Sequence, residues 1–341
     1  MRTKLTKKKP SCFKILKTRS KQKGGTSRGK YCSPSRNSNN AFSCYSLNDL
    51  NVFAKSLNIS VSPSLQKDKQ KLWNTLDENL KSECNTEYCW ASKFAPTSYA
   101  FENIKQIAFR PPMPLSWKQN TNQWLNSNDI RNVMTQYESA EPGFRFIGPV
   151  PLDFQTKVSE DICITSELCK VNVLNWWKEG TRKLGIVFNL DPHDMPGSHW
   201  VASYCDFESG IISYYDSFGT APPQEIHNLL NTLAKQCELL LDKPVEIQIN
   251  NIRHQFKNTE CGIYSIYFLS EMSTKNISFK EFIADNYNDK QIQRFRSYFY
   301  NTFDLYTATT TGGGNGQCTN KRKRKRYNTR KQRGNGIHKR R

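Results

Sequence analysis

The chain has 341 residues, enough for one large domain or two smaller ones, and its hydrophobic fraction of 36% permits a packed core. The formal net charge of +20 is not spread evenly: residues 1–40 hold 13 Lys/Arg, residues 311–341 hold 12, and neither stretch holds Asp or Glu. The middle of the chain therefore has 25 basic residues against all 30 acidic ones, so the basic character belongs to two tails and not to the fold.

The sequence predicts a soluble intracellular protein with free thiols. Met1–Lys9 leads into more Lys rather than an apolar run, so we expect no signal peptide. No apolar stretch reaches the ~18 residues that a membrane span needs. Eleven Cys is an odd number without paired spacing, and the step from Cys84 to Cys89 is not that of a zinc knuckle. We expect most of these Cys to be small buried hydrophobic side chains.

The first part of the chain predicts a tail followed by helices. Residues 1–40 are rich in Lys, Arg, Ser, Gly and Asn, and we expect them to be a disordered basic tail. Residues 41–135 are expected to form a helical accessory region. Three segments of it show helical apolar spacing, the first with a capped start at Ser46: residues 46–54, 68–82 and 124–139.

The next part, residues 136–310, has strand signals interleaved with helix signals. The expected strands are residues 144–150, 183–190, 199–207, 211–215 and 245–252. The expected helices are residues 172–180, 224–241, 261–272, 279–283 and 291–303. Strands and helices around one sheet predict an α+β fold. Residues 311–341 are again Gly-rich and basic and predict a second disordered tail.

Four residues of the α+β part are placed where catalysis could use them: His199, Asp216, Gln255 and Cys261. Cys261 opens an apolar predicted helix, and the positive end of the helix dipole favours the reactive thiolate. Gly262 would let a substrate carbonyl approach the backbone N–H groups at the same point.

The predicted strands bring a base and a carboxylate to this thiol. His199 starts one strand and Asp216 ends the next, so the tight turn between the strands makes them neighbours. A carboxylate on one imidazole nitrogen fixes the tautomer and leaves the other nitrogen for the thiol. The side-chain N–H of Gln255 could join the Cys261 backbone N–H as an oxyanion hole. His254, next to Gln255, is the one serious rival for the base.

Each of these residues has an ordinary structural reading when taken alone. A His before Trp is usually packed at the surface, a Cys-Gly pair is usually structural, and an Asp in Tyr-Asp-Ser-Phe-Gly is usually a turn residue. Their joint occurrence in one order favours catalysis. No metal or other cofactor is expected, because His193, His199 and Cys205 lack ligand-pair spacing.

Three segments resemble the peptidase superfamily that contains adenovirus protease and the SUMO-specific proteases: Gly197–Ala202, Ile212–Gly219 and Glu260–Tyr264. The order His, Asp, Gln, Cys is that of the superfamily and the reverse of papain-like enzymes, where Gln and Cys come first. Over about residues 145–305, the resemblance implies a papain-like cysteine protease of the adenain/SUMO-protease topology, with a central mixed sheet flanked by helices.

The resemblance also implies a role for individual residues. His199 would be the base, Asp216 its orienting carboxylate, Gln255 the oxyanion donor and Cys261 the nucleophile. Trp200 would cover a narrow substrate channel that admits only small residues before the scissile bond. Glu260 stands where SUMO proteases usually have Asp, and its charge is expected to oppose the thiolate slightly.

A narrower resemblance concerns the substrate. Segments Glu87–Trp90 and Asn128–Glu138 look like the virion-maturation (core polyprotein) thiol proteases of large DNA viruses. This implies a thiol endopeptidase that cleaves structural polyproteins after Gly-Gly-like sites, in the virion and at assembly sites in the host cytoplasm. Deconjugation of SUMO or other ubiquitin-like modifiers is the alternative within the superfamily.

The tails leave further alternatives open. Lys321–Arg326 is a run of six basic residues that could contact nucleic acid, act as a nuclear targeting signal or be a solvated tail. A basic nucleic-acid-binding packaging protein without catalysis is the alternative from another class, and an active-site thiol probe would distinguish it. The expected partners are a protein substrate and, through the tails, nucleic acid; no membrane partner is expected.

Overall fold

The computed structural model describes residues 31–36, 42–84, 86–94, 99–274, 277–284 and 287–302. All of them belong to one compact unit, residues 1–310. The two predicted basic tails therefore lie outside the described residues, except for residues 31–36. The basic run Lys321–Arg326 lies outside them as well.

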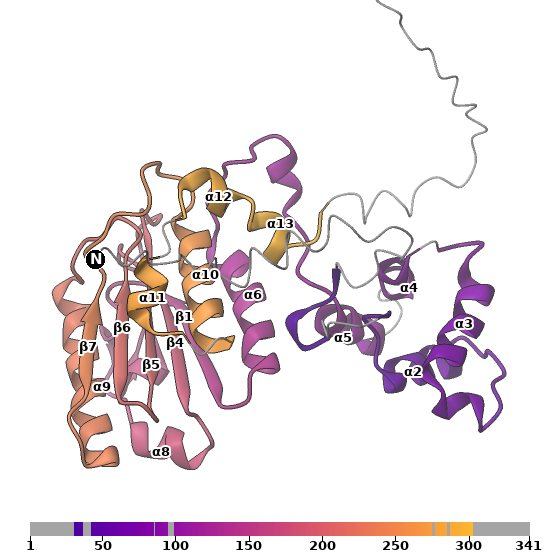
Figure 1. Cartoon of the computed structure of the whole chain (residues 1–341), viewed down its shortest axis with the longest axis horizontal. Coiled ribbons are helices and arrows are strands. Elements are labelled where there is room, and N and C mark those ends of the chain that lie inside the picture. Colours follow the sequence, from indigo (N-terminus) through magenta and orange to yellow (C-terminus); the bar gives the residue numbers. More distant parts are fainter. Residues whose placement is uncertain are drawn as a thin grey trace, which may run out of the picture. The chain divides into compact units, whose positions relative to one another are not determined.

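A five-stranded mixed sheet is the framework that positions the predicted site (Figure 1). Its order is β1-β4-β5-β6-β7; β1/β4 and β6/β7 are parallel, and β4/β5 and β5/β6 are antiparallel. The strands are β1 Phe144–Val150, β4 Lys183–Asn189, β5 Trp200–Asp206, β6 Ile211–Tyr215 and β7 Glu246–Ile249. All five predicted strands are confirmed, with small changes at their ends.

Helices cover both faces of this sheet (Figure 1). One face packs against α8 (Val173–Lys178) and α9 (Gln224–Leu241), and the other against α6 (Ser127–Ala140) and α10 (Cys261–Thr274). Helix α10 is buried from Cys261 to Ser273 and consists mostly of apolar residues, as expected of a central helix. The predicted α+β class, a mixed sheet flanked by helices, is confirmed.

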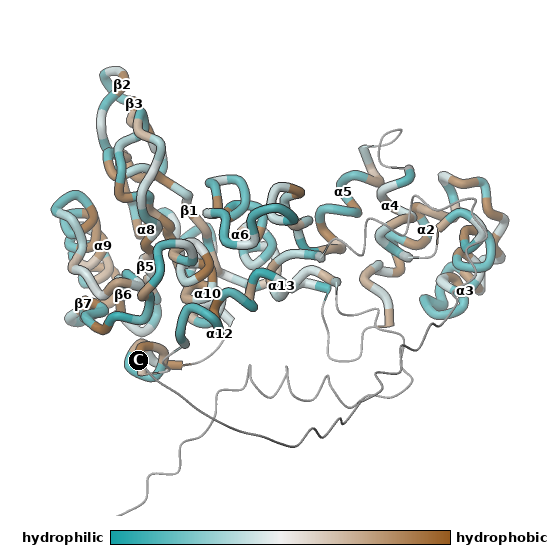
Figure 2. The backbone as a smooth tube through the Cα atoms, turned by 90° about the horizontal axis from the view of Figure 1, so that it is seen from above, coloured by the Kyte–Doolittle hydropathy of each residue, from teal (hydrophilic) through white to brown (hydrophobic). Residues whose placement is uncertain are grey.

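Smaller elements complete this part of the fold. The predicted helix over residues 291–303 is two short helices, because a turn at Arg294 and Phe295 separates them. A short hairpin stands out from the fold (Figure 2). The smaller elements, including the two strands of this hairpin, are β2 Lys157–Ser159, β3 Ile162–Cys163, α7 Ser166–Cys169, α11 Phe279–Ala284, α12 Asp289–Gln293 and α13 Arg296–Phe299.

A helical region with its own core precedes the sheet. Its helices are α2 Leu47–Ser56, α3 Lys69–Leu80, α4 Glu87–Phe94 and α5 Tyr99–Ala108, with short 3-10 helices at Pro34–Arg36 and Leu65–Lys67. The predicted start at Ser46 is confirmed: its Oγ accepts from Asp49 N at 3.1 Å, and the Asp49 carboxylate accepts from Ser46 N at 2.7 Å.

The hydrophobic cores divide the chain earlier than the expected boundary near residue 135. The core of the helical region ends at Phe109, and the next core begins at Trp117, which lies in the 3-10 helix Leu115–Lys118. Helix α6 belongs to the second core, because its apolar face packs with α10 and β1. Cys32, expected in the basic tail, belongs to the first core.

Six cysteines form three disulfides within the described residues, so the expectation of free thiols is wrong for them. The pairs are Cys32–Cys44, Cys84–Cys89 and Cys163–Cys169.

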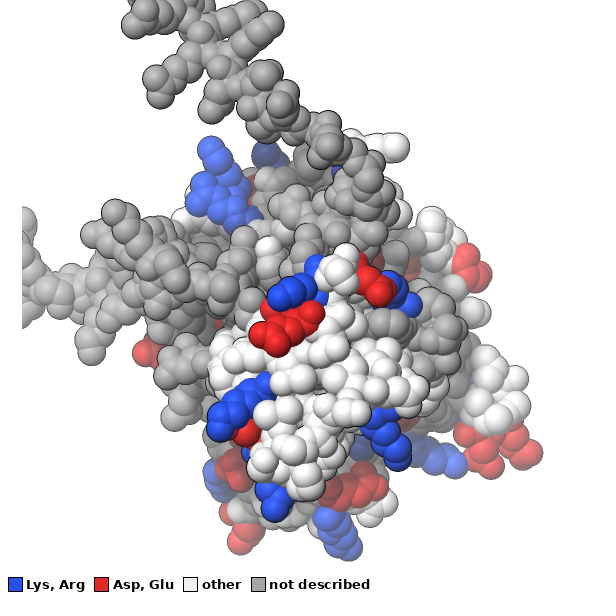
Figure 3. Space-filling model, turned by 90° about the vertical axis from the view of Figure 1, so that its right-hand side faces the viewer, with Lys and Arg blue, Asp and Glu red and all other residues white. Residues whose placement is uncertain are grey.

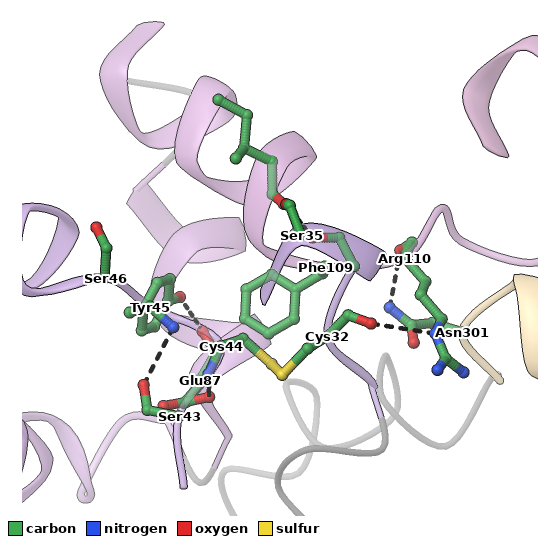
Figure 4. Close-up of a disulfide and its surroundings, with 12 residues drawn as sticks. Cys32, Ser35, Ser43, Cys44, Tyr45, Ser46, Glu87, Phe109, Arg110 and Asn301 are labelled. Carbon is green, nitrogen blue, oxygen red and sulfur yellow. Dashed lines mark hydrogen bonds between the residues drawn. A yellow bond between two sulfur atoms is a disulfide. The ribbon is translucent and has the colours of Figure 1, made fainter. Parts of the chain in front are cut away.

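The Cys32–Cys44 bridge lies within the helical region, and hydrogen bonds of Arg110 link it to Asn301 after α13 (Figure 4). Cys44 N donates to Glu87 Oε2 at 3.0 Å, and Arg110 Nε donates to the Cys32 carbonyl at 3.1 Å. The Arg110 carbonyl in turn accepts from Asn301 Nδ2 at 2.8 Å.

The surface charges of the described residues agree with the near balance of the middle of the chain. On the face drawn in Figure 3, basic and acidic side chains are interspersed around an uncharged area. Within the residues that the structure describes, no helix has both the length and the apolar character needed to cross a membrane.

Candidate active site

The antiparallel pair β5/β6 brings His199 and Asp216 together. His199 directly precedes β5 and Asp216 directly follows β6. Nε2 of His199 lies 2.6 Å from Oδ1 of Asp216. The His199 side chain is 11% exposed and that of Asp216 only 1%, so little solvent screens the pair.

The turn after β6 holds both partners in place. The Asp216 carboxylate accepts from the backbone N–H of Phe218 at 2.8 Å and of Thr220 at 3.3 Å. The Phe218 ring stacks on the His199 imidazole, with ring centroids 4.5 Å apart and planes inclined by 16°. The imidazole is therefore fixed at its edge by Asp216 and on its face by Phe218.

Cys261 is the first residue of α10, as predicted, and it is among the groups that raise the pKa of His199. Burial lowers the pKa of His199, but the hydrogen bonds and charges of Asp216 and Cys261 outweigh burial and raise that pKa to about 9. His199 is therefore an imidazolium at neutral pH. An imidazolium and a helix N-terminus are the surroundings in which cysteines act as nucleophiles.

The other two free thiols of the described residues are poor nucleophiles. Cys205 and Cys237 are buried in the core between the sheet and α9. Burial raises the pKa of both thiols above its usual range. They therefore remain protonated and unreactive at neutral pH.

The pKa of His199 predicts the alkaline limit of activity. A group with a raised pKa keeps its proton below that pKa and loses it above, so kcat/KM should fall with an apparent pKa of about 9. In Asp216→Asn the alkaline fall of kcat/KM should occur at lower pH, because the carboxylate that stabilises the imidazolium is gone. We would measure both profiles on one peptide; an alkaline limb that stays in place in the variant would contradict this assignment.

Gln255 is held by the same turn that holds Asp216. Ser217 Oγ donates to Gln255 Oε1 at 2.6 Å, and the Ser217 carbonyl accepts from Gln255 N at 2.8 Å. Gln255 Nε2 donates to the Lys257 carbonyl at 2.5 Å. One N–H of the amide is thus used by Lys257, and the Gln255 side chain is fully buried.

His254, the predicted rival for the base, is a core residue. Its Nδ1 accepts from the Tyr215 hydroxyl at 2.9 Å, and its Nε2 donates to the Ile283 carbonyl at 3.0 Å. Burial lowers the pKa of His254, so the ring is neutral. Both ring nitrogens are used, and neither is left for a thiol.

Trp200 and Gly262 both pack against Leu125. Trp200 Nε1 donates to the Leu125 carbonyl at 2.9 Å. A Cβ on Gly262 would lie 3.0 Å from Leu125 Cβ and 3.3 Å from Trp200 Cδ1. A side chain at position 262 would crowd Leu125 and Trp200, so packing at the helix start favours glycine there. This explanation for Gly262 is separate from the predicted approach of a substrate carbonyl.

Trp124, next to Leu125, is an exposed aromatic residue that the sequence analysis did not consider for the substrate site. It is 41% exposed, although it adjoins the segment that covers Trp200 and Gly262. The predicted helix started at Trp124, whereas α6 begins at Ser127 behind the cap residue Asn126. Trp124 lies in the loop and is not part of the helix.

Glu260, expected to oppose the thiolate, has a buried cationic partner. Arg296 Nε donates to Glu260 Oε2 at 2.9 Å, and Arg296 lies over the Trp117 ring. Burial raises the pKa of Glu260, while the charge of Arg296 counteracts that rise. Arg296 therefore offsets the negative charge next to Cys261. It lies 36 positions from Glu260 in the sequence, so no local pattern indicated it.

A thiol at a helix start, an imidazolium beside it and a buried carboxylate behind the imidazole are the arrangement that thiol hydrolases use. Together with the mixed sheet, this arrangement defines a cysteine peptidase in which the histidine and the carboxylate precede the cysteine in the sequence.

Comparisons with known proteins agree with this class. Residues 173–308 match the family model described as "Ulp1 protease family, C-terminal catalytic domain". The predicted thiol protease R355 of Acanthamoeba polyphaga mimivirus is 24% identical over 289 residues, 79% of this chain and 92% of that protein. Cysteine protease S273R of African swine fever virus is 30% identical over 125 residues, 36% of this chain and 45% of that protein.

The crystal structure of the African swine fever virus pS273R protease has the same fold. It superposes with a TM-score of 0.58 at 21% identity, over 81% of this chain and 97% of that chain. The part of the chain that holds the site, residues 173–308, is similar to the Ulp1 protease family, and the protein is a cysteine protease.

Proposed function

We propose that the protein is an endopeptidase that cuts a structural polyprotein after small residues, with Cys261 as nucleophile, His199 as base, Asp216 as orienting carboxylate and Gln255 as oxyanion donor. The observation that carries the proposal is the placement of His199. Its Nε2 is taken by Asp216 at 2.6 Å, and Asp216 and Cys261 both raise its pKa. An imidazole held in this way can take and return a proton at one fixed atom.

The acylation half-reaction uses the ion pair. The Cys261 thiolate attacks the carbonyl carbon, a C–S bond forms, and the carbonyl oxygen becomes an oxyanion. That oxyanion would accept hydrogen bonds from the Gln255 amide and the Cys261 backbone N–H. The His199 imidazolium gives its proton to the leaving nitrogen, the C–N bond breaks, and a thioester remains on Cys261.

The deacylation half-reaction reverses these roles. Neutral His199 takes a proton from water, and the water oxygen attacks the thioester carbonyl. The C–S bond breaks, Cys261 leaves as a thiolate, and the acid product departs. His199 is again an imidazolium, so the ion pair is restored for the next cycle.

A viral polyprotein substrate is supported by the relatives. The mimivirus thiol protease is matched over 92% of its length, and the cysteine protease S273R described above also comes from a virus, African swine fever virus. Such a protein would act in the virion and at assembly sites in the host cytoplasm. Binding of nucleic acid by the basic tails remains a prediction from the sequence.

Deconjugation of a ubiquitin-like modifier is the second candidate, because African swine fever virus relatives carry the name "SUMO-1 cysteine protease". A cleavage assay on a panel of Gly-Gly peptides, beside SUMO and ubiquitin conjugates, separates the two. Cleavage of internal Gly-Gly peptides supports the endopeptidase, whereas cleavage of conjugates alone supports the second candidate.

Trp200, which packs against Gly262 at the start of α10, predicts a strict preference for small residues before the cut. If Trp200 and Trp124 line the channel, a bulky residue at either of the two positions before the scissile bond should lower kcat/KM by about 100-fold or more, beyond what a missing methylene contributes. Trp124→Ala should relax this preference, and Trp177→Ala on α8 should not. Mass spectrometry of a peptide-library digest measures it; efficient cleavage after Leu, Phe or Arg by the unaltered protein would refute the prediction.

A further inference from the structure

An exposed arginine beside the site is held between two aromatic rings. The Arg253 guanidinium lies 5.2 Å from the Phe218 ring centroid and 5.3 Å from that of Phe256. Its Nε donates to the Gln255 carbonyl at 2.8 Å. Phe256 is 68% exposed, so this arrangement stands at the surface.

The backbone that carries Arg253 is packed tightly against the turn after β6. Gly219 has a φ of +75°, and a Cβ there would lie 3.0 Å from Arg253 N and 2.9 Å from the Ile252 carbonyl carbon. The carbonyl of Ser217 accepts from the N–H of the next residue, His254, at 2.9 Å. Arg253 is thus fixed relative to His199 through the turn that holds the catalytic imidazole.

The guanidinium of Arg253 has no acidic partner within the residues that the structure describes. No carboxylate there lies within ion-pair distance of it. Asp289, the nearby acid, is buried and accepts from the N–H groups of Phe256 and Lys257. Lys257 is itself exposed, so the local surface is positive. A guanidinium already oriented by stacking loses little freedom when it binds a carboxylate in a bidentate pair.

The proposed mechanism brings the leaving group near this arginine. His199 would give its proton to the leaving nitrogen, so the residues that follow the scissile bond are expected near His199 and the ring stacked on it. The centroid distances are 4.5 Å from His199 to Phe218 and 5.2 Å from Phe218 to Arg253. An extended chain covers this path in about three residues at ~3.3–3.6 Å each.

We propose that Arg253, clamped by Phe218 and Phe256, is a specificity-determining residue that binds an acidic side chain at the second or third position after the scissile bond. The inference rests on the proposed function and adds to it the substrate class on the leaving-group side. It predicts natural cleavage sites with a small pair before the cut and Asp or Glu shortly after it.

Matched peptides test this inference in the full-length protein. The peptides share the residues before the cut and carry Asp, Asn or Lys at the second and third positions after it. The unaltered protein should cleave the Asp peptide with a kcat/KM about 10-fold above the Lys peptide. The ratio should fall towards one at high salt, because exposed charges are screened.

Two variants of Arg253 and one control complete the test. Arg253→Gln should abolish the preference and Arg253→Glu should reverse it. Lys235→Glu, which makes the same charge change at an exposed position of α9, should keep the Asp preference. Titration of Cys261 with a thiol reagent counts active sites in each sample, so misfolding is not mistaken for lost specificity.

The outcomes separate this inference from the proposed function. Equal hydrolysis of the Asp and Lys peptides, or an Asp preference kept by Arg253→Glu, would overturn the role of Arg253 and leave the endopeptidase intact. No hydrolysis of any peptide with a small pair before the cut would count against the endopeptidase itself.

Discussion

Cys261→Ala should lower peptide hydrolysis by about 10,000-fold or more while the fold is retained, because the nucleophile of a covalent mechanism has no substitute. The substitution removes one sulfur atom at the start of α10, and Ala is a good helix former. The kcat/KM of the variant, with circular dichroism and thermal unfolding, gives both parts of the result.

Cys237→Ala is the matched control for the nucleophile. Cys237 is a free thiol buried under the sheet, and burial raises its pKa. The variant should keep near-normal turnover and lose stability, because it leaves a small cavity in the core. Normal hydrolysis by Cys261→Ala, or an inactive but folded Cys237→Ala, would show that the wrong thiol has been assigned.

His199→Ala should be as damaging as the loss of Cys261, and Asp216→Asn less so. Without the imidazolium, the thiolate loses its counter-ion and the leaving nitrogen loses its proton donor. Asp216 only orients and stabilises His199, and in catalytic triads the loss of the carboxylate alone costs less than the loss of the nucleophile or the base. Both variants are compared by kcat/KM at pH 7.

His254→Gln is the control for the base. His254 makes its two hydrogen bonds to Tyr215 and Ile283 inside the core, so its loss should reduce stability more than chemistry. An inactive, folded His254→Gln together with an active His199→Ala would mean that the histidines have been assigned the wrong way round.

Local patterns in the sequence predicted most of the elements that position the site. The bounds of α9 and β6 are those predicted, because strong apolar periodicity and clear turn residues mark both ends. Cys261 opens its helix as predicted, and the pairing of β5 with β6 places His199 beside Asp216 as expected. These features depend on spacing that is readable along one stretch of chain.

The features that sequence reasoning missed depend on contacts between distant stretches. Arg296 reaches Glu260 across 36 positions, and Ser217 reaches Gln255 across 38. Phe218 lies within the segment that carried the resemblance, but its stacking on His199 could not be predicted because it depends on the conformation of the turn after β6. The disulfides were missed because spacings of 12, 5 and 6 residues do not reveal which thiols meet.

Covalent labelling of Cys261 tests the central claim most directly. A peptide ending in Gly-Gly that carries an electrophile at its carboxyl end reacts with the thiolate that the site activates, and mass spectrometry locates the adduct. We expect the adduct on Cys261, lost in His199→Ala, with Cys205 and Cys237 unmodified. An adduct on Cys205 or Cys237, or labelling of Cys261 that is indifferent to the loss of His199, would contradict the account.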